Sequence, residues 1–135
     1  MSRLARVVVI ALAVVGGLYV LVLLRFSFGC ASEQTALIPS PSGRHAASIS
    51  VGRCNRDEPE RLTVWLSDGR DSRTSTSVFI ANKRSNADDG AELHAYVRWT
   101  GDSALEVAYP FYLQVTSTSD NVDGVAVTFK RSDDR

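Results

Sequence analysis

The feature that most constrains this chain is an uninterrupted apolar run from Val7 to Leu24. None of these eighteen residues is charged, and Arg3, Arg6 and Arg25 flank the run. An α-helix of this length spans about 27 Å, close to the ~30 Å hydrocarbon core of a bilayer. The run therefore predicts one transmembrane helix over residues 7–24, with the rest of the chain on one side of a membrane.

The basic residues beside the run predict its orientation. Arg3 and Arg6 precede it, whereas Arg25 is the only basic residue that follows it before Arg44. Cytoplasmic flanks carry the excess of Lys and Arg. We therefore expect residues 1–6 in the cytoplasm and the chain beyond the helix on the outer side of the membrane. That part divides into a tether with a first turn (25–44) and a domain (45–135).

Two other interpretations of this segment compete with a retained signal-anchor. A cleavable signal peptide has an apolar core of ~7–15 residues and small residues at its cleavage site. Residues 29–31 (Gly-Cys-Ala) supply small residues, but the core is longer and Arg25 interrupts the approach. A lipoprotein signal would place Cys30 at the new amino terminus, although residues 26–27 (Phe-Ser) replace the usual branched aliphatic residue. The length of the run favours the anchor, and the cleaved and lipidated forms stay open.

The charge distribution argues against one class of partner. The whole chain has 15 basic and 15 acidic residues, but all 15 acidic residues and only 12 basic ones follow residue 25, a balance of −3. A nucleic-acid-binding surface needs basic residues that neutralise phosphates. We therefore expect no nucleic-acid partner. The roughly 105 residues beyond the run are a common size for one domain.

Both cysteines, Cys30 and Cys54, follow the apolar run. An even count in an oxidising compartment indicates a disulfide, which in the chain-entropy model contributes on the order of 3 kcal/mol for a loop of this length. We predict a Cys30–Cys54 bridge that ties the tether to the domain. The alternative is two separate thiols, or Cys30 carrying a lipid and Cys54 unpaired.

Beyond the helix the pattern changes to the alternation of half-buried strands. Leu62, Val64 and Leu66 alternate with Thr63 and Trp65. The same period recurs at residues 47–51, 93–99, 105–107, 111–115 and 125–129, with a shorter strand at 78–81, and turn residues stand at 40–43, 67–69, 100–103 and 120–124. Short connections favour antiparallel neighbours. We predict an all-β domain of six to seven sequentially paired strands, as a small antiparallel sandwich or a curved sheet.

Residues that carry catalysis or hold metals lack the spacing that such chemistry needs. The only histidines, His45 and His94, have no cysteine or carboxylate near them at ligand spacing. The acidic residues at 57–60 lack the order of a calcium loop, and residues 101–103 (Gly-Asp-Ser) fit a hairpin turn better than a nucleophile elbow. We expect no catalytic residue, no metal and no cofactor, so an enzyme is the weakest hypothesis.

A candidate ligand face consists of Tyr96, Arg98 and Tyr112, which stand on the polar phase of their predicted strands. The competing interpretation is a solvated face or part of a second core. Segments 53–61 and 82–91 are predicted to be exposed loops, where binding residues often lie, although neither contains an aromatic residue.

Several short motifs together resemble a group of small uncharacterised bacterial membrane-anchored envelope proteins. They are the N-terminal anchor, the two cysteines, the Ser-Pro-x-Gly-Arg turn at Ser40–Arg44, and the segments 78–81, 97–99, 105–109 and 125–129. Ser42 stands where those relatives carry Asp, and residues 55–58 replace a Gly-Ala-Thr-like stretch. The resemblance implies the envelope compartment and a β-rich domain, and it brings no activity.

Taken together, these patterns favour an accessory or protein-interaction module of the cell envelope, held by a single membrane span. A small-ligand or cell-wall-binding module is the alternative. The sequence leaves the oligomeric state open.

Overall fold

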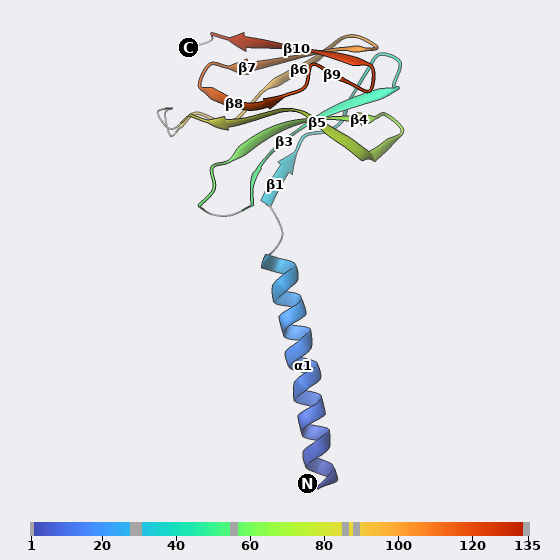
Figure 1. The fold of residues 1–135 in the computed structure, drawn as a ribbon, viewed down its shortest axis with the longest axis vertical. Coiled ribbons are helices and arrows are strands. Elements are labelled where there is room, and N and C mark those ends of the chain that lie inside the picture. Colours follow the sequence, from blue (N-terminus) through green and yellow to red (C-terminus); the bar gives the residue numbers. More distant parts are fainter. Residues whose placement is uncertain (1, 28–30, 55–56, 85–86, 88–89, 134–135) are drawn as a thin grey trace. The chain divides into compact units, whose positions relative to one another are not determined.

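The computed structural model describes the chain except residues 1, 28–30, 55–56, 85–86, 88–89 and 134–135. It forms two compact units, residues 1–30 and residues 31–135. The first unit is a helix, and the second is built of strands (Figure 1). This confirms the prediction of an all-β domain preceded by one helix.

The helix α1 runs from Arg3 to Ser27 and contains the whole of the predicted span 7–24. Its 25 residues correspond to about 37 Å. From Leu4 to Leu24 its large apolar side chains are exposed. By length and composition it is the one helix among the described residues that could cross a membrane.

The described residues between 31 and 133 form ten strands in two sheets. The larger sheet has the order β1-β3-β4-β5-β8, with β2 also paired to β3, and the smaller has the order β6-β7-β10-β9. The strands are β1 (Ala31–Gln34), β2 (Ile38–Pro39), β3 (His45–Arg53), β4 (Arg61–Asp68), β5 (Asp71–Lys83), β6 (Tyr96–Gly101), β7 (Ala104–Pro110), β8 (Leu113–Thr118), β9 (Asn121–Val122) and β10 (Val125–Ser132).

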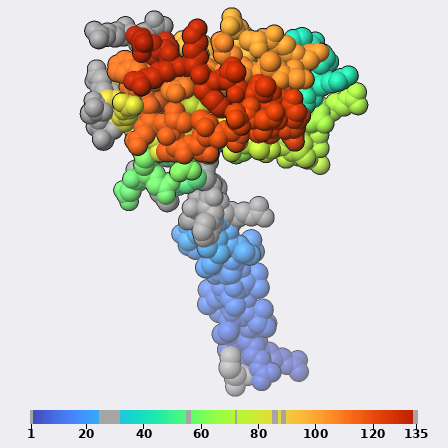
Figure 2. All heavy atoms as spheres, turned by 45° about the horizontal axis from the view of Figure 1, so that its top comes forward, coloured from blue at the N-terminus to red at the C-terminus, as the bar shows by residue number. Residues whose placement is uncertain are grey.

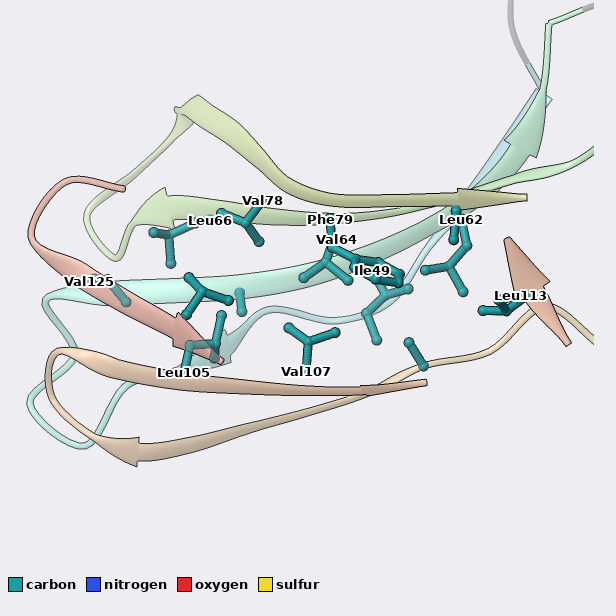
Figure 3. Close-up of a cluster of buried hydrophobic side chains, with 14 residues drawn as sticks. Ile49, Leu62, Val64, Leu66, Val78, Phe79, Leu105, Val107, Leu113 and Val125 are labelled. Carbon is teal, nitrogen blue, oxygen red and sulfur yellow. The ribbon is translucent and has the colours of Figure 1, made fainter. Parts of the chain in front are cut away.

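The two sheets enclose one hydrophobic core, in which their side chains point toward each other (Figure 3). The centre of this core is aromatic. The Phe79 ring of the larger sheet lies 5.0 Å from Tyr109 and 5.8 Å from Phe129 of the smaller one, measured between ring centroids. The predicted core positions of β4 are confirmed, because Leu62, Val64 and Leu66 are all buried. The strand is more than half-buried, however, since Thr63 between them is buried as well.

Strand β5 is longer than the predicted segment 78–81. Its first half is polar, so the alternation of apolar residues did not reveal it. Residues 71–77 carry no apolar side chain, yet Ser75, Thr76 and Ser77 all pair with β4. The register shifts between Phe79 and Ser77, which leaves Val78 unpaired in a β-bulge. The bulge explains why Val78 and Phe79 are both buried although they are adjacent in sequence.

The expected order, sequential and antiparallel, is wrong in part, most clearly where the chain passes between the two sheets. Strands β7 and β10 pair in parallel, with Leu105 opposite Val127 and Val107 opposite Phe129. Strand β8, which lies between them in sequence, joins the larger sheet beside β5 instead. The chain therefore crosses to the other sheet and returns, and such a crossover connects parallel neighbours.

The predicted turns are present, and two of them use backbone conformations with positive φ. Gly43 has a φ of 73°, and its N–H donates to the Ser40 carbonyl at 2.9 Å. Asp123 and Gly124, with φ of 51° and 78°, form the two-residue turn between β9 and β10. Positive φ at both central residues is the signature of a type I′ turn, for which Asp-Gly is a preferred pair.

Candidate functional site

Two of the three residues predicted to form a ligand face come together in the structure. Tyr96 opens β6 and is 69% exposed, whereas Tyr112 lies in the turn between β7 and β8 and is half-buried. His94 connects them. Its ring centroid lies 5.5 Å from that of Tyr96 and 6.2 Å from that of Tyr112, both in edge-on geometry.

Hydrogen bonds hold Tyr112 and His94 in this arrangement. The Tyr112 hydroxyl donates to the Glu92 carbonyl at 2.8 Å and lies 3.1 Å from His94 Nδ1. When the Tyr112 hydroxyl directs its proton at the Glu92 carbonyl, the hydroxyl oxygen can accept a hydrogen bond from His94 Nδ1. Burial raises the pKa of the Tyr112 phenol above its ordinary value of 10.0, and the negative charges of Glu92 and ionised Tyr96 add to the rise.

Phe111 belongs to the same surface, and the sequence pattern misplaced it. The alternation put Phe111 on the apolar phase of a strand over 111–115, but β8 begins at Leu113 and Phe111 is 38% exposed in the preceding turn. Its ring packs edge-on against Tyr112 at 5.8 Å. Pro110 immediately before it was the available signal for a turn. We call His94, Tyr96, Phe111 and Tyr112 the aromatic surface.

The register of the smaller sheet explains why Tyr96 is so exposed. Tyr96 stands opposite Ala108 of β7, whose methyl group covers little of a phenol ring. The next residue of β6 on the same face is Arg98, which pairs with Glu106 of β7 at 3.0 Å. Arg98 therefore lies beside the aromatic surface on the same face of β6, and its guanidinium is paired with Glu106. Figure 2 shows how the C-terminal strands, in orange and red, form a broad face of the β-domain.

The remaining polar and aromatic candidates have local structural explanations. Trp65 is half-buried on the outer face of the larger sheet, where its Nε1–H donates to Ser50 Oγ at 2.8 Å. Gly101 ends β6, and Asp102 and Ser103 form the hairpin turn to β7, in agreement with the predicted turn. Glu60 pairs with Arg53 at 3.1 Å. Within the described residues, no group of three or more metal-ligating side chains gathers.

The predicted disulfide and both predicted loops, 53–61 and 82–91, reach positions outside the described residues. Cys30 is one of these positions, and in the described part of the chain Cys54 is not a free cysteine. The Cys30–Cys54 bridge stays a prediction. Asn82 and Lys83, expected at the start of a loop, end strand β5 instead, and part of the segment up to Ala91 is not described.

Comparisons with known proteins found no matching family model, no matching curated protein and no matching solved structure.

Proposed function

We propose that this chain is a membrane-anchored interaction module of the cell envelope, whose β-domain binds a partner protein through the aromatic surface. The observation that carries the proposal is the state of Tyr96. A ring that is 69% exposed is nevertheless oriented by edge contact with His94. Exposed aromatic side chains are enriched among the residues that contribute most to protein–protein binding.

The surroundings of Tyr96 support binding with a small entropic cost. His94 Nδ1 lies within hydrogen-bond distance of the Tyr112 hydroxyl, and the Tyr112 hydroxyl donates to the Glu92 carbonyl. Tyr112 also packs against the core of the sandwich. Side chains that are already ordered lose less conformational freedom when a partner binds. Phe111 adds exposed apolar area on the other side of Tyr112.

The proposal also includes the cellular location of the protein. Retention of α1 as an anchor, with residues 1–6 in the cytoplasm, follows from its length and from the basic residues Arg3 and Arg6. The β-domain would then lie in the periplasm at a bacterial inner membrane, as in the group of envelope proteins that the chain resembles. An oxidising periplasm would also support the Cys30–Cys54 bridge.

The test is site-specific cross-linking of the full-length protein in membranes. A photoreactive amino acid replaces Tyr96 in one variant and Thr100 in the control, which is exposed on the same face of β6. We expect one dominant envelope protein to be captured from position 96 and little from position 100. Equal capture from both positions, or capture of no reproducible partner, would contradict the proposal.

A small-ligand or cell-wall-binding module is the second candidate, favoured by the Arg98–Glu106 pair beside the open Tyr96 ring. A flat ring next to paired charges is suited to a polar molecule with an apolar face. Binding of soluble cell-wall fragments to the full-length protein in detergent tests it. Loss of binding in Tyr96→Ala and Arg98→Ala without loss of folding would favour this candidate, and failure of either variant to fold would mark that residue as structural.

A further inference from the structure

A second potential binding site lies away from the aromatic surface, at an end of the sandwich where several turns meet. The Ser42 N–H donates to Asp102 Oδ1 at 2.6 Å, the Gly69 N–H to the Arg44 carbonyl at 2.9 Å, and the Ala126 N–H to the Ser103 carbonyl at 2.8 Å. A cleft of about 480 Å³ opens here, within the usual range for small-molecule sites. Its lining consists of Arg44, His45, Asp68, Arg70, Thr74 and Asp123.

The walls of the cleft are held by the backbone. Gly69 approaches Gly43 so closely that a Cβ at position 69 would overlap the Gly43 carbonyl oxygen. His45 stands opposite Asp68 across β3 and β4, and its ring stacks on Trp99 with centroids 6.3 Å apart. The Trp99 Nε1–H donates to the Ile38 carbonyl at 2.9 Å. The lining residues are therefore presented from ordered elements of both sheets.

Within the described residues, the charged side chains of the cleft form no ion pair. The ion pairs in the described part of the chain join Arg53 to Glu60 and Arg98 to Glu106, so neither Arg44 nor Arg70 takes part. Among the described residues, the Asp123 carboxylate has no hydrogen-bond or ion-pair partner. Asp68 Oδ1 accepts one bond from the Arg70 backbone N–H at 3.0 Å. Two guanidinium groups and two carboxylates thus face one cleft.

We propose that this cleft binds a small zwitterionic molecule. Guanidinium groups recognise phosphate and carboxylate through paired hydrogen bonds, which assigns the anionic end to Arg44 and Arg70. The carboxylates of Asp68 and Asp123 take the ammonium end. The four charges sum to zero, so a simple anion or a simple cation is attracted by one pair and repelled by the other and gains less than a molecule that carries both charges. A free metabolite and a lipid headgroup share this chemistry.

The probe is phosphoethanolamine, titrated calorimetrically into the full-length protein in a non-ionic detergent. Inorganic phosphate and ethanolamine supply each charge alone, and β-alanine supplies a carboxylate zwitterion. We expect at least one zwitterion to bind about tenfold or more tightly than either single-charge probe, since each charge-assisted hydrogen bond contributes enough for that factor. Equal affinity for phosphate or ethanolamine alone, or no saturable binding of either zwitterion, would overturn the proposal.

Variants assign the binding to the cleft. Arg70→Gln and Asp123→Asn should each weaken binding of the zwitterion by about tenfold. Asn tolerates the positive φ at position 123, so the turn is preserved. Arg131→Gln, at an exposed position near the end of β10 that does not line the cleft, is the matched control and should leave affinity unchanged. Equal losses in the control would overturn the assignment, and none of these tests depends on the aromatic surface.

Nanodiscs distinguish the two sources of the zwitterion. In discs of phosphatidylglycerol the soluble probe should bind as it does in detergent. If the same probe no longer binds in discs of phosphatidylethanolamine, a lipid headgroup occupies the cleft. If it binds equally in both, the cleft takes a soluble molecule. Both results support a zwitterion site, whereas loss of binding in phosphatidylglycerol discs alone would contradict it.

Discussion

The helix and the sandwich use the same apolar side chains in opposite ways. In α1, Leu12, Leu21 and the valines around them are all exposed, whereas Leu62 and Val64 in β4 are buried almost completely. Burial of a Leu or Val side chain stabilises a fold by about 1.5–3 kcal/mol. The sandwich obtains this stabilisation from its own core. The described residues of the helix form no such core, and by length and composition this helix could cross a membrane.

The test with the largest expected effect replaces one large apolar side chain by alanine in each region. Phe79→Ala should lower the free energy of unfolding of the β-domain by about 3–5 kcal/mol, because it leaves a cavity between Tyr109 and Phe129. Leu12→Ala should leave it unchanged. Denaturation of the full-length protein in detergent measures this by tryptophan fluorescence, since both tryptophans lie in the β-domain.

A fall in β-domain stability in Leu12→Ala would break the comparison, because it would show that the helix packs against the sandwich. Leu12→Arg sharpens the test from the other side. It should impair membrane insertion, for which a central Arg costs about 2.5–3.5 kcal/mol, and leave the fluorescence transition in place. Alkaline extraction of membranes measures the retained fraction.

The second prediction concerns the link between the two regions. If Cys30 and Cys54 form a disulfide, reduction should lower the stability of the β-domain by about 3 kcal/mol. The Cys30→Ser/Cys54→Ser double variant is the control, because its transition should not respond to reductant. Thiol labelling with and without reductant gives an independent readout, and labelling of the untreated protein at both cysteines would refute the bridge.

The sequence predicted the helix and the alternating strands because both signals are local. Eighteen uncharged residues define α1 without reference to the rest of the chain. The first half of β5 has no such signal, since Ser75 and Thr76 are held there by pairing with β4. The parallel pairing of β7 with β10 was also missed, because short connections do not reveal which sheet β8 will join.

The candidate site also contains features that a local sequence pattern predicts and features that only the tertiary fold produces. The exposure of Tyr96 and Arg98 follows from the period of one strand and was predicted. The contact of His94 with Tyr112 depends on where the chain crosses between the sheets, so no local pattern contains it. Arg98 was predicted to act with the two tyrosines, but its ionic partner is Glu106 across the strand pair.

The third prediction compares glycines of the two regions. Gly69→Ala should destabilise the β-domain by about 1–3 kcal/mol, because the added Cβ forces the Gly43 carbonyl to move. Gly16→Ala in α1 is the matched control, since nothing lies within 4 Å of a Cβ at that position. Thermal unfolding followed by tryptophan fluorescence measures both. An unchanged free energy of unfolding in Gly69→Ala would contradict this prediction, because it would show that the turns at Gly43 and Gly69 can move apart without destabilising the domain.

The last prediction has the smallest expected effect and concerns Tyr112 at the margin of the core. Its pKa is raised in the folded β-domain, chiefly by burial, so the folded state favours the neutral phenol. The associated stability is fully present below pH 10, the ordinary pKa, and is lost as the pH rises through the raised value. Tyr112→Phe should remove this alkaline loss. At neutral pH it should cost about 1 kcal/mol for the hydrogen bond to Glu92.

Urea denaturation between neutral pH and pH 11, compared for the two proteins, separates these contributions. The helix adds no signal, because the tryptophan transition reports on the sandwich alone. An equal alkaline loss in Tyr112→Phe would assign the effect to other groups and remove Tyr112 from the explanation. A loss confined to the wild-type protein would show that Tyr112 is protected in solution, as a firmly held support for the exposed Tyr96 ring requires.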